Sequence, residues 1–408
     1  MNDRHWLATY AEYGIPAEID PDVHPSVVHM LEGAMKAHAE KPAFRSFGQT
    51  LSYADVDRQS RNFAAYLQKK LGVKKGDRIA VMMPNLLAFP IAFLGIVRAG
   101  AAQVNVNPLY TPRELEHQLK DAGVKIMVVF AGCTATVAEV TASTGLQTVI
   151  VAGPGDGSTA KLPSPPVDPR LSGALAFADV LAEGAKLAFE QVSLNGDDLL
   201  FLQYTGGTTG LSKGASLSHR NLVANTEQFK AAMGSAPPSA DDVIVTAIPL
   251  YHIFALMVNF ITYFSVGADN WLVANPRDMD SFIQTLQQAK PSVFMGVNTL
   301  YAGLVAHPKI AEVDFSNLRL AGGGGAAVIA AVSAKWEKIT GQIIREGYGL
   351  SETSPVLTFN PMYLTEFSGT TGLPMPSTDI RLLDDSDRDV AIGEPGEICA
   401  KGPQIMSG

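Results

Sequence analysis

The most informative segment of this 408-residue sequence is Gln203-Tyr204-Thr205-Gly206-Gly207-Thr208-Thr209-Gly210-Leu211-Ser212-Lys213-Gly214. An apolar run of strand length, 199–202, comes before it, and Ser218 follows as a candidate helix cap. Glycines let a backbone approach a ligand closely, and the freed N–H groups can hold an anion. Hydroxyls and a lysine donate to phosphate oxygens. The stretch therefore predicts a phosphate-binding loop between a strand and a helix.

The spacing of this loop differs from that of a Walker A motif. That motif has four residues between a glycine and Gly-Lys-Ser/Thr. Here Lys213 comes three residues after Gly210 and is followed by Gly214. A solvated surface loop is the alternative, but such loops rarely gather so many residues suited to phosphate.

Composition and charge exclude several classes of protein. Hydrophobic residues make up 47% of the chain and charged residues 17%, which is typical of a folded protein with a large core. The net charge of −9 argues against a nucleic-acid-binding surface. The two cysteines, Cys133 and Cys399, exclude a disulfide framework and fit a reducing cytosol. No secretory signal opens the chain, and the apolar stretches 86–97 and 253–266 are too short to span a membrane, so we expect buried core helices there.

Strand-like and helix-like segments alternate along most of the chain, which predicts an α/β fold with a doubly wound, mainly parallel sheet. Ser26, Ser52 with Asp55, and Thr111 with Glu114 are expected to cap helices. Apolar strand candidates cover 77–83, 125–130, 148–151, 243–249 and 291–297. The Pro-, Gly- and Ser-rich stretch 153–172 is expected to be a surface connection.

A chain of this length exceeds the size at which a single core stops growing, so two or more subdomains are expected. We place α/β subdomains at 1–195 and 196–365. From about 366 short alternating segments appear between turns, which predicts the start of a small antiparallel β-barrel at 366–408.

Two more glycine-containing stretches follow strand candidates. The run 322–327 satisfies the relaxed dinucleotide fingerprint G-x-G-x-x-A, with Glu346 as a doubtful ribose ligand. An NAD(P)-dependent oxidoreductase is therefore an alternative function, and close-packing glycines are the plainer explanation. The second stretch is Gly347-Tyr348-Gly349-Leu350-Ser351-Glu352, in which Glu352 alone would be taken for an exposed loop acid.

The segment from Tyr204 to Gly214 resembles the phosphate-binding signature of the adenylate-forming superfamily, which includes acyl-CoA synthetases, luciferases and peptide-synthetase adenylation domains. Tyr348 to Glu352 is similar to the Tyr-Gly-x-Thr-Glu motif of that superfamily, with Ser351 in place of the threonine. The stretches 105–115 and 372–378 look like those of bacterial long-chain fatty-acyl-CoA synthetases. The resemblance covers essentially the whole chain and implies the N-terminal AMP-binding domain of such an enzyme, 1–408.

The resemblance also implies roles for individual residues. Tyr348 would stack on adenine, Ser351 would bond the α-phosphate, and His252 would lie beside the acyl carboxylate, although a lone histidine after a strand is more often a core residue. The implied catalytic residues are Lys213, His252 and Glu352, and the implied Mg²⁺ ligands are Thr205 and Glu352. The implied nucleotide-binding residues are Thr205, Gly206, Gly207, Thr208, Thr209, Gly210, Lys213, Gly323, Gly324, Gly325, Gly347, Tyr348, Gly349, Leu350 and Ser351.

The implied activity is an ATP-dependent, AMP-forming ligation of a long-chain fatty acid to CoA, with Mg²⁺ as cofactor. The apolar stretches 253–266 and 293–304 would line the acyl tunnel, and ordinary core is the alternative. Some long-chain members carry a Trp gate where this chain has Leu256. The resemblance predicts a cytoplasmic protein and is compatible with peripheral contact at the inner membrane and with a homodimer.

In the family, a Thr-Gly-Asp segment and a smaller C-terminal domain with a catalytic lysine follow this domain. Neither lies within the 408 residues, so we expect low activity from this chain alone. A non-catalytic nucleotide-binding module is a third possibility.

Overall fold

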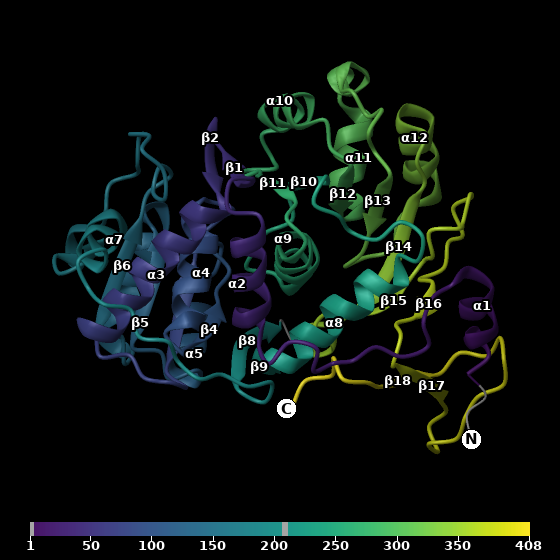
Figure 1. Ribbon diagram of the computed structural model, residues 1–408, viewed down its shortest axis with the longest axis horizontal. Coiled ribbons are helices and arrows are strands. Elements are labelled where there is room, and N and C mark those ends of the chain that lie inside the picture. The colour runs from purple at the N-terminus through teal and green to yellow at the C-terminus, as the bar shows by residue number, and fades with distance from the viewer. Residues whose placement is uncertain (1–3, 206–210) are drawn as a thin grey trace.

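The computed structural model describes residues 4–205 and 211–408 and contains two large β-sheets with helices packed against them (Figure 1). The sheets lie side by side, and helices α2, α4 and α9 lie between them in this view. This arrangement confirms the predicted α/β class with mainly parallel sheets.

The first sheet has seven strands in the order β7-β6-β5-β3-β4-β8-β9. Its strands are parallel except for the last pair, β8 and β9, which is antiparallel. Their bounds are β3 (Arg78–Met82), β4 (Ala102–Asn105), β5 (Ile126–Phe130), β6 (Thr148–Ala152), β7 (Leu175–Ala176), β8 (Leu199–Thr205) and β9 (Lys213–Ser218).

The second sheet has nine strands in the order β16-β15-β14-β13-β12-β10-β11-β1-β2. Its centre, from β14 to β1, is parallel, and antiparallel pairs close both edges. Their bounds are β1 (Pro42–Ser46), β2 (Gln49–Ser52), β10 (Val243–Thr246), β11 (Asp269–Leu272), β12 (Val293–Gly296), β13 (Leu320–Gly323), β14 (Ile344–Gly349), β15 (Val356–Phe359) and β16 (Leu373–Pro374).

Helices start where the sequence places caps. The Ser26 side chain accepts from the His29 N–H, and Ser52, Thr111 and Ser218 each form a capping box. The helices are α1 (Trp6–Tyr13), α2 (Val27–Ala37), α3 (Tyr53–Lys69), α4 (Ala88–Arg98), α5 (Pro112–Asp121), α6 (Thr134–Val140), α7 (Phe177–Gly184), α8 (His219–Ala232), α9 (Tyr263–Ser265), α10 (Met279–Ala289), α11 (Asn298–Ala306) and α12 (Ala330–Thr340), together with a π-helix at Ala255–Thr262.

One continuous apolar core joins the two sheets. It contains side chains from α2, α3, α4, α8 and the π-helix, and from strands of both sheets. Phe93 of α4 shows the connection, because its ring contacts Phe201 of the seven-stranded sheet and Phe260 of the π-helix. The two apolar stretches considered as membrane candidates are thus buried in this core, and no helix among the described residues is long and apolar enough to cross a membrane.

The structure differs from the sequence-based prediction at three places. Lys213 and Gly214 belong to strand β9 and not to the loop, because the backbone pairs with β8 in antiparallel register. Gly322 and Gly323 lie inside β13, and Gly347 to Gly349 lie inside β14. Glycine tolerates strand geometry, so a glycine run does not by itself mark where a strand ends.

The predicted division at residues 195 and 196 does not coincide with the division between the sheets. Strands β8 and β9 complete the first sheet, whereas the hairpin of β1 and β2 joins the second. Near the C-terminal end, β17 (Asp379–Leu383) and β18 (Glu397–Lys401) form a two-stranded antiparallel sheet. This is the small antiparallel unit that was predicted, and its extension into a barrel stays a prediction.

Candidate active site

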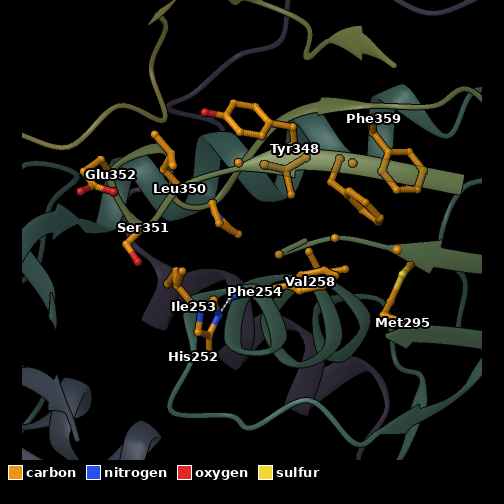
Figure 2. Close-up of a pocket in the computed structure, with 18 of the residues that line it drawn as sticks. His252, Ile253, Phe254, Val258, Met295, Tyr348, Leu350, Ser351, Glu352 and Phe359 are labelled. Atoms are coloured by element: carbon orange, nitrogen blue, oxygen red, sulfur yellow. Dashed lines mark hydrogen bonds between the residues drawn. The ribbon is translucent and has the colours of Figure 1, made fainter. Parts of the chain in front are cut away.

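A pocket of about 590 Å³ lies at the carboxyl ends of β13 and β14, against the start of the π-helix (Figure 2). Ligands of open α/β sheets commonly bind at this edge of the strands. The pocket is lined by Thr205, Phe229, His252, Ile253, Phe254, Val258, Met295, Gly323, Gly324, Gly325, Gly347, Tyr348, Gly349, Leu350, Ser351, Glu352, Pro355, Val356 and Phe359. Residues predicted from four separate motifs therefore share one cavity.

The two ends of the pocket differ in chemistry. Glu352, Ser351 and His252 gather at one end, whereas Val258, Met295 and Phe359 lie toward the other (Figure 2). Phe229 of α8 contacts the Phe359 ring at a centroid distance of 5.5 Å and closes the apolar end. One cavity thus offers polar groups for a charged ligand and an apolar wall for a hydrocarbon.

Glycines in the wall of the pocket let neighbouring backbone segments approach closely. A Cβ added at Gly349 would lie 1.8 Å from the Pro355 carbonyl oxygen, which is far closer than any real contact. Gly325 has a φ of +74°, a conformation that other residues rarely adopt. Bare backbone therefore faces the pocket on this side, next to Tyr348.

His252 lies at the polar end of the pocket, shortly before the π-helix begins. Its Nδ1 accepts from the Phe254 N–H at 3.2 Å, so in the neutral ring the proton is on Nε2. Solvent reaches the side chain through the pocket mouth, yet protein surrounds much of the ring, and this burial lowers its pKa. A neutral imidazole at this position can donate a hydrogen bond from Nε2 to an anionic group.

A chain of buried amides holds the backbone next to His252. Gln203 Nε2 donates to the Tyr251 carbonyl at 3.2 Å, and Gln203 Oε1 accepts from Asn105 Nδ2 at 2.9 Å. Gln103 in turn donates to Asn105 Oδ1 at 2.7 Å. Because all three amides are buried, the chain links the seven-stranded sheet rigidly to the histidine.

The predicted phosphate loop lies partly outside the described residues, and this applies to Gly206, Gly207, Thr208, Thr209 and Gly210. The residues on either side of it, up to 205 and from 211, are described. Thr205 and Lys213 are opposite each other in the antiparallel register, and Thr205 lines the pocket while Lys213 is exposed. Tyr204 donates to Asp121 at 2.5 Å, and His117 Nε2 lies 2.9 Å from the Ser212 carbonyl oxygen. The end of strand β8 at Thr205 therefore lies at the pocket.

The polar end suits a divalent cation that arrives with a nucleotide. Within residues 4–205 and 211–408, no group of three His, Cys, Asp or Glu side chains could hold a metal by itself. The Glu352 carboxylate and the Thr205 hydroxyl line the same cavity and are oxygen donors. Mg²⁺ commonly takes one or two protein oxygens and completes its shell with phosphate and water, so these residues fit such an ion.

The structure does not favour a dinucleotide site at 322–327. Glu346, the doubtful ribose ligand, accepts a hydrogen bond from the Val328 N–H at 2.8 Å and is buried. Helix α12 begins only at Ala330, so the glycines do not open a helix in the way that the fingerprint requires.

Several lining residues were not predicted as site residues. Phe229 comes from α8, and Pro355, Val356 and Phe359 come from the segment around β15. Only the pairing of β14 with β15 and the packing of α8 bring them to the pocket. From the two stretches expected to line an acyl tunnel, Ile253, Phe254, Val258 and Met295 line the cavity, and its use by an acyl chain stays a prediction.

Comparison with known proteins agrees with this site. Residues 31–408 match the family of AMP-binding enzymes. The chain is 44% identical to the long-chain-fatty-acid–CoA ligase of Salmonella typhimurium, over 99% of this chain and 74% of that protein. The fold is similar to that of a crystallised long-chain-fatty-acid-CoA ligase from Archaeoglobus fulgidus, with a TM-score of 0.81, 25% identity, and coverage of 94% of this chain and 76% of that one.

The ATP-bound structure of MatB from Rhodopseudomonas palustris is also similar, with a TM-score of 0.79, 28% identity, and coverage of 93% and 71%. The class defined by the fold and the pocket is therefore that of the adenylate-forming CoA ligases. This chain belongs to the AMP-binding enzyme family.

Proposed function

We propose that this chain is the nucleotide- and acyl-binding part of an ATP-dependent long-chain fatty-acid–CoA ligase. The proposal rests on one observation. Ser351 and Glu352 at a polar end and Met295 and Phe359 at an apolar end line the same pocket. The Salmonella relative, which is 44% identical over almost the whole chain, is a long-chain-fatty-acid–CoA ligase and supports the same activity.

In the proposed first step, a carboxylate oxygen of the fatty acid attacks the α-phosphorus of ATP. An O–P bond forms, the bond to the β-phosphate oxygen breaks, and acyl-AMP and pyrophosphate result. Catalysis of such a transfer is mainly positioning and neutralisation of charge. Tyr348 and the glycine surface would hold the adenine, and Ser351 would donate to the α-phosphate.

The remaining roles in this step follow from the site. His252 would donate from Nε2 to the acyl carboxylate, and Lys213 would supply positive charge to the phosphates. A Mg²⁺ ion held by Glu352, Thr205 and phosphate oxygens would neutralise charge on the phosphates when bound.

In the proposed second step, the CoA thiol loses its proton to solvent and its sulfur attacks the acyl carbonyl carbon. A thioester bond forms, the bond to the phosphate oxygen of AMP breaks, and AMP leaves with the electron pair. A cytoplasmic location, contact with the inner membrane and a homodimer stay predictions of the family resemblance.

The test of this proposal is acid-dependent release of pyrophosphate from ATP. The purified protein is given ATP, Mg²⁺ and a series of straight-chain fatty acids, and acyl-CoA is measured after CoA is added. We expect release that depends on a fatty acid, together with an increase in melting temperature on adding ATP or AMP. Stabilisation by NAD or NADP alone, without pyrophosphate release, would contradict the proposal and favour the oxidoreductase alternative.

A further inference from the structure

Arg345 is a buried cation without a carboxylate partner among the described residues. Only 6% of the residue is exposed, and its Nη2 donates to the carbonyl oxygens of Met362 at 3.2 Å and Leu364 at 2.9 Å. Its Nε and Nη1 are also buried, and neither contacts an acceptor in the part of the chain that the structure describes. Burial alone lowers the pKa of this guanidinium, yet arginine keeps its charge in proteins.

Two other arginines with buried or partly buried side chains have carboxylate partners. Arg98, whose side chain is fully buried, forms ion pairs with Glu32 at 3.0 Å and with Asp57 at 2.5 Å. Arg319, which is partly buried, pairs with Asp242 at 2.5 Å. A buried charge without a partner is strongly unfavourable, so an unpaired guanidinium that persists in a core calls for a specific explanation. Glu346, the next residue along the strand, lies on the opposite face of the sheet, where its carboxylate is bonded to Val328.

The strand register places Arg345 next to the apolar end of the pocket. Gly322 pairs with Met295 on one side and with Arg345 on the other, so both side chains stand on one face of the sheet with no side chain between them. Gly347, two residues after Arg345 on the same face, pairs with Phe359. Of the residues labelled in Figure 2, Met295 and Phe359 lie on the side away from Glu352 and Ser351, and the register places Arg345 on the strand beside them.

The wall between the pocket and Arg345 is movable on one side. Met295 is an unbranched side chain with three rotatable bonds, and it lies over Gly322, which has no side chain to hold it in place. A chain that started beside His252 and passed Val258 would run toward Met295 (Figure 2), and the register places the strand of Arg345 beyond Met295 and Gly322.

We propose that Arg345 forms the distal end of the acyl site and binds an acceptor oxygen at the ω carbon of the acid. The inference rests on the proposed function and adds a substrate class to it, namely long-chain acids with a terminal carboxylate or hydroxyl. The free Nε and Nη1 groups would donate to that oxygen, and a terminal carboxylate would also supply the missing counter-charge. An unsubstituted acid leaves the guanidinium unpaired, so it binds less tightly than an ω-oxygenated acid of the same chain length.

Calorimetric titration of the purified protein with matched acids tests the proposal. At each of several chain lengths, the monocarboxylic acid, its ω-hydroxy derivative and the α,ω-dicarboxylic acid are compared. We expect one range of lengths at which an ω-oxygen tightens binding by about tenfold or more, the gain typical of a hydrogen bond to a charged group. A gain with the diacid alone identifies a charge pair, and a gain with both identifies an oxygen acceptor in general.

The variant Arg345→Met removes the charge and keeps an unbranched side chain. It should abolish the preference for ω-oxygenated acids and bind the unsubstituted acid at least as tightly as the parent. Arg381→Met, which removes an exposed arginine of β17 that pairs with Asp389, is the matched control and should leave the preference unchanged. If Arg345→Met does not fold, the parent's chain-length series still overturns the inference when it shows no preference for an ω-oxygen at any length.

Two outcomes would overturn the inference: no preference for ω-oxygenated acids at any chain length, or a preference that Arg345→Met retains. Neither outcome touches the proposed ligase activity, which is judged by pyrophosphate release with unsubstituted acids. Conversely, if the parent protein releases no pyrophosphate with any acid, the proposed ligase activity is wrong, and this failure is distinct from a failure of the Arg345 inference.

Discussion

Gly349→Ala should disable the site while leaving the fold in place. The Cβ of the alanine would lie 1.8 Å from the Pro355 carbonyl oxygen, whereas real Cβ atoms essentially never come within 3.0 Å of such an atom. The same carbonyl accepts a hydrogen bond from the Leu350 N–H at 3.1 Å. The backbone at Gly349 must therefore move by more than about 1 Å, and Ser351 and Glu352 move with it, which on its own is enough for roughly a hundredfold loss of rate.

The assay for this change is fatty-acid-dependent exchange of pyrophosphate into ATP, measured together with the melting temperature. Gly33→Ala is the control, because a Cβ there meets nothing within 4 Å and the residue lies inside helix α2. That control should keep full activity and gain about 0.5–1 kcal/mol of stability. Exchange within a few-fold of the parent in Gly349→Ala would refute the argument that this glycine holds Ser351 and Glu352 in place.

Three further predictions concern single side chains. Lys213→Ala should weaken ATP binding much more than fatty-acid binding in calorimetric titrations, and an equal effect on both would remove Lys213 from the phosphate site. Glu352→Gln should abolish the Mg²⁺ dependence of ATP affinity and spare AMP, so a mutant whose ATP affinity still rises with Mg²⁺ contradicts the assigned ligand. Burial lowers the pKa of His219 to about 4. As the pH drops, this histidine is therefore protonated in the unfolded chain before it is protonated in the folded chain. The free energy of unfolding then falls between about pH 6.5 and pH 4. Between about pH 7.5 and pH 5 the parent should lose about 2 kcal/mol more stability than His219→Gln in urea titrations, and equal losses would show that this histidine does not drive the change.

Local signals in the sequence predicted much of the fold. The caps at Ser26, Ser52, Thr111 and Ser218 act within three residues of themselves, so neighbouring residues alone fix where those helices begin. Apolar runs predicted the central strands for a similar reason, since a strand buried on both faces needs an uninterrupted apolar stretch.

Glycine-rich strands were harder to predict. Glycine is uncommon in strand interiors, so 322–323 and 347–349 looked like loops. The close approach of the Pro355 backbone and of the Met295 and Phe359 side chains is what requires glycine there, and none of these contacts is visible in the sequence. For the same reason Lys213 was taken for a loop residue, although its pairing with Thr205 makes it part of a strand.

The residues at the polar end of the pocket could be named from the sequence alone. Thr205, Tyr348, Ser351 and Glu352, which line the pocket, were all named from short motifs, because the residue types and spacing of a motif are visible in the sequence. Their roles in binding a nucleotide stay predictions. The residues that lie across the pocket from these motifs depend on the tertiary structure. Side chains meet across a sheet according to strand order and register, which depend on the packing of the whole chain. That register, with the packing of α8, brings Phe359 and Phe229 to the apolar end of the pocket and places Arg345, buried and without a carboxylate partner among the described residues, on the strand beside its wall.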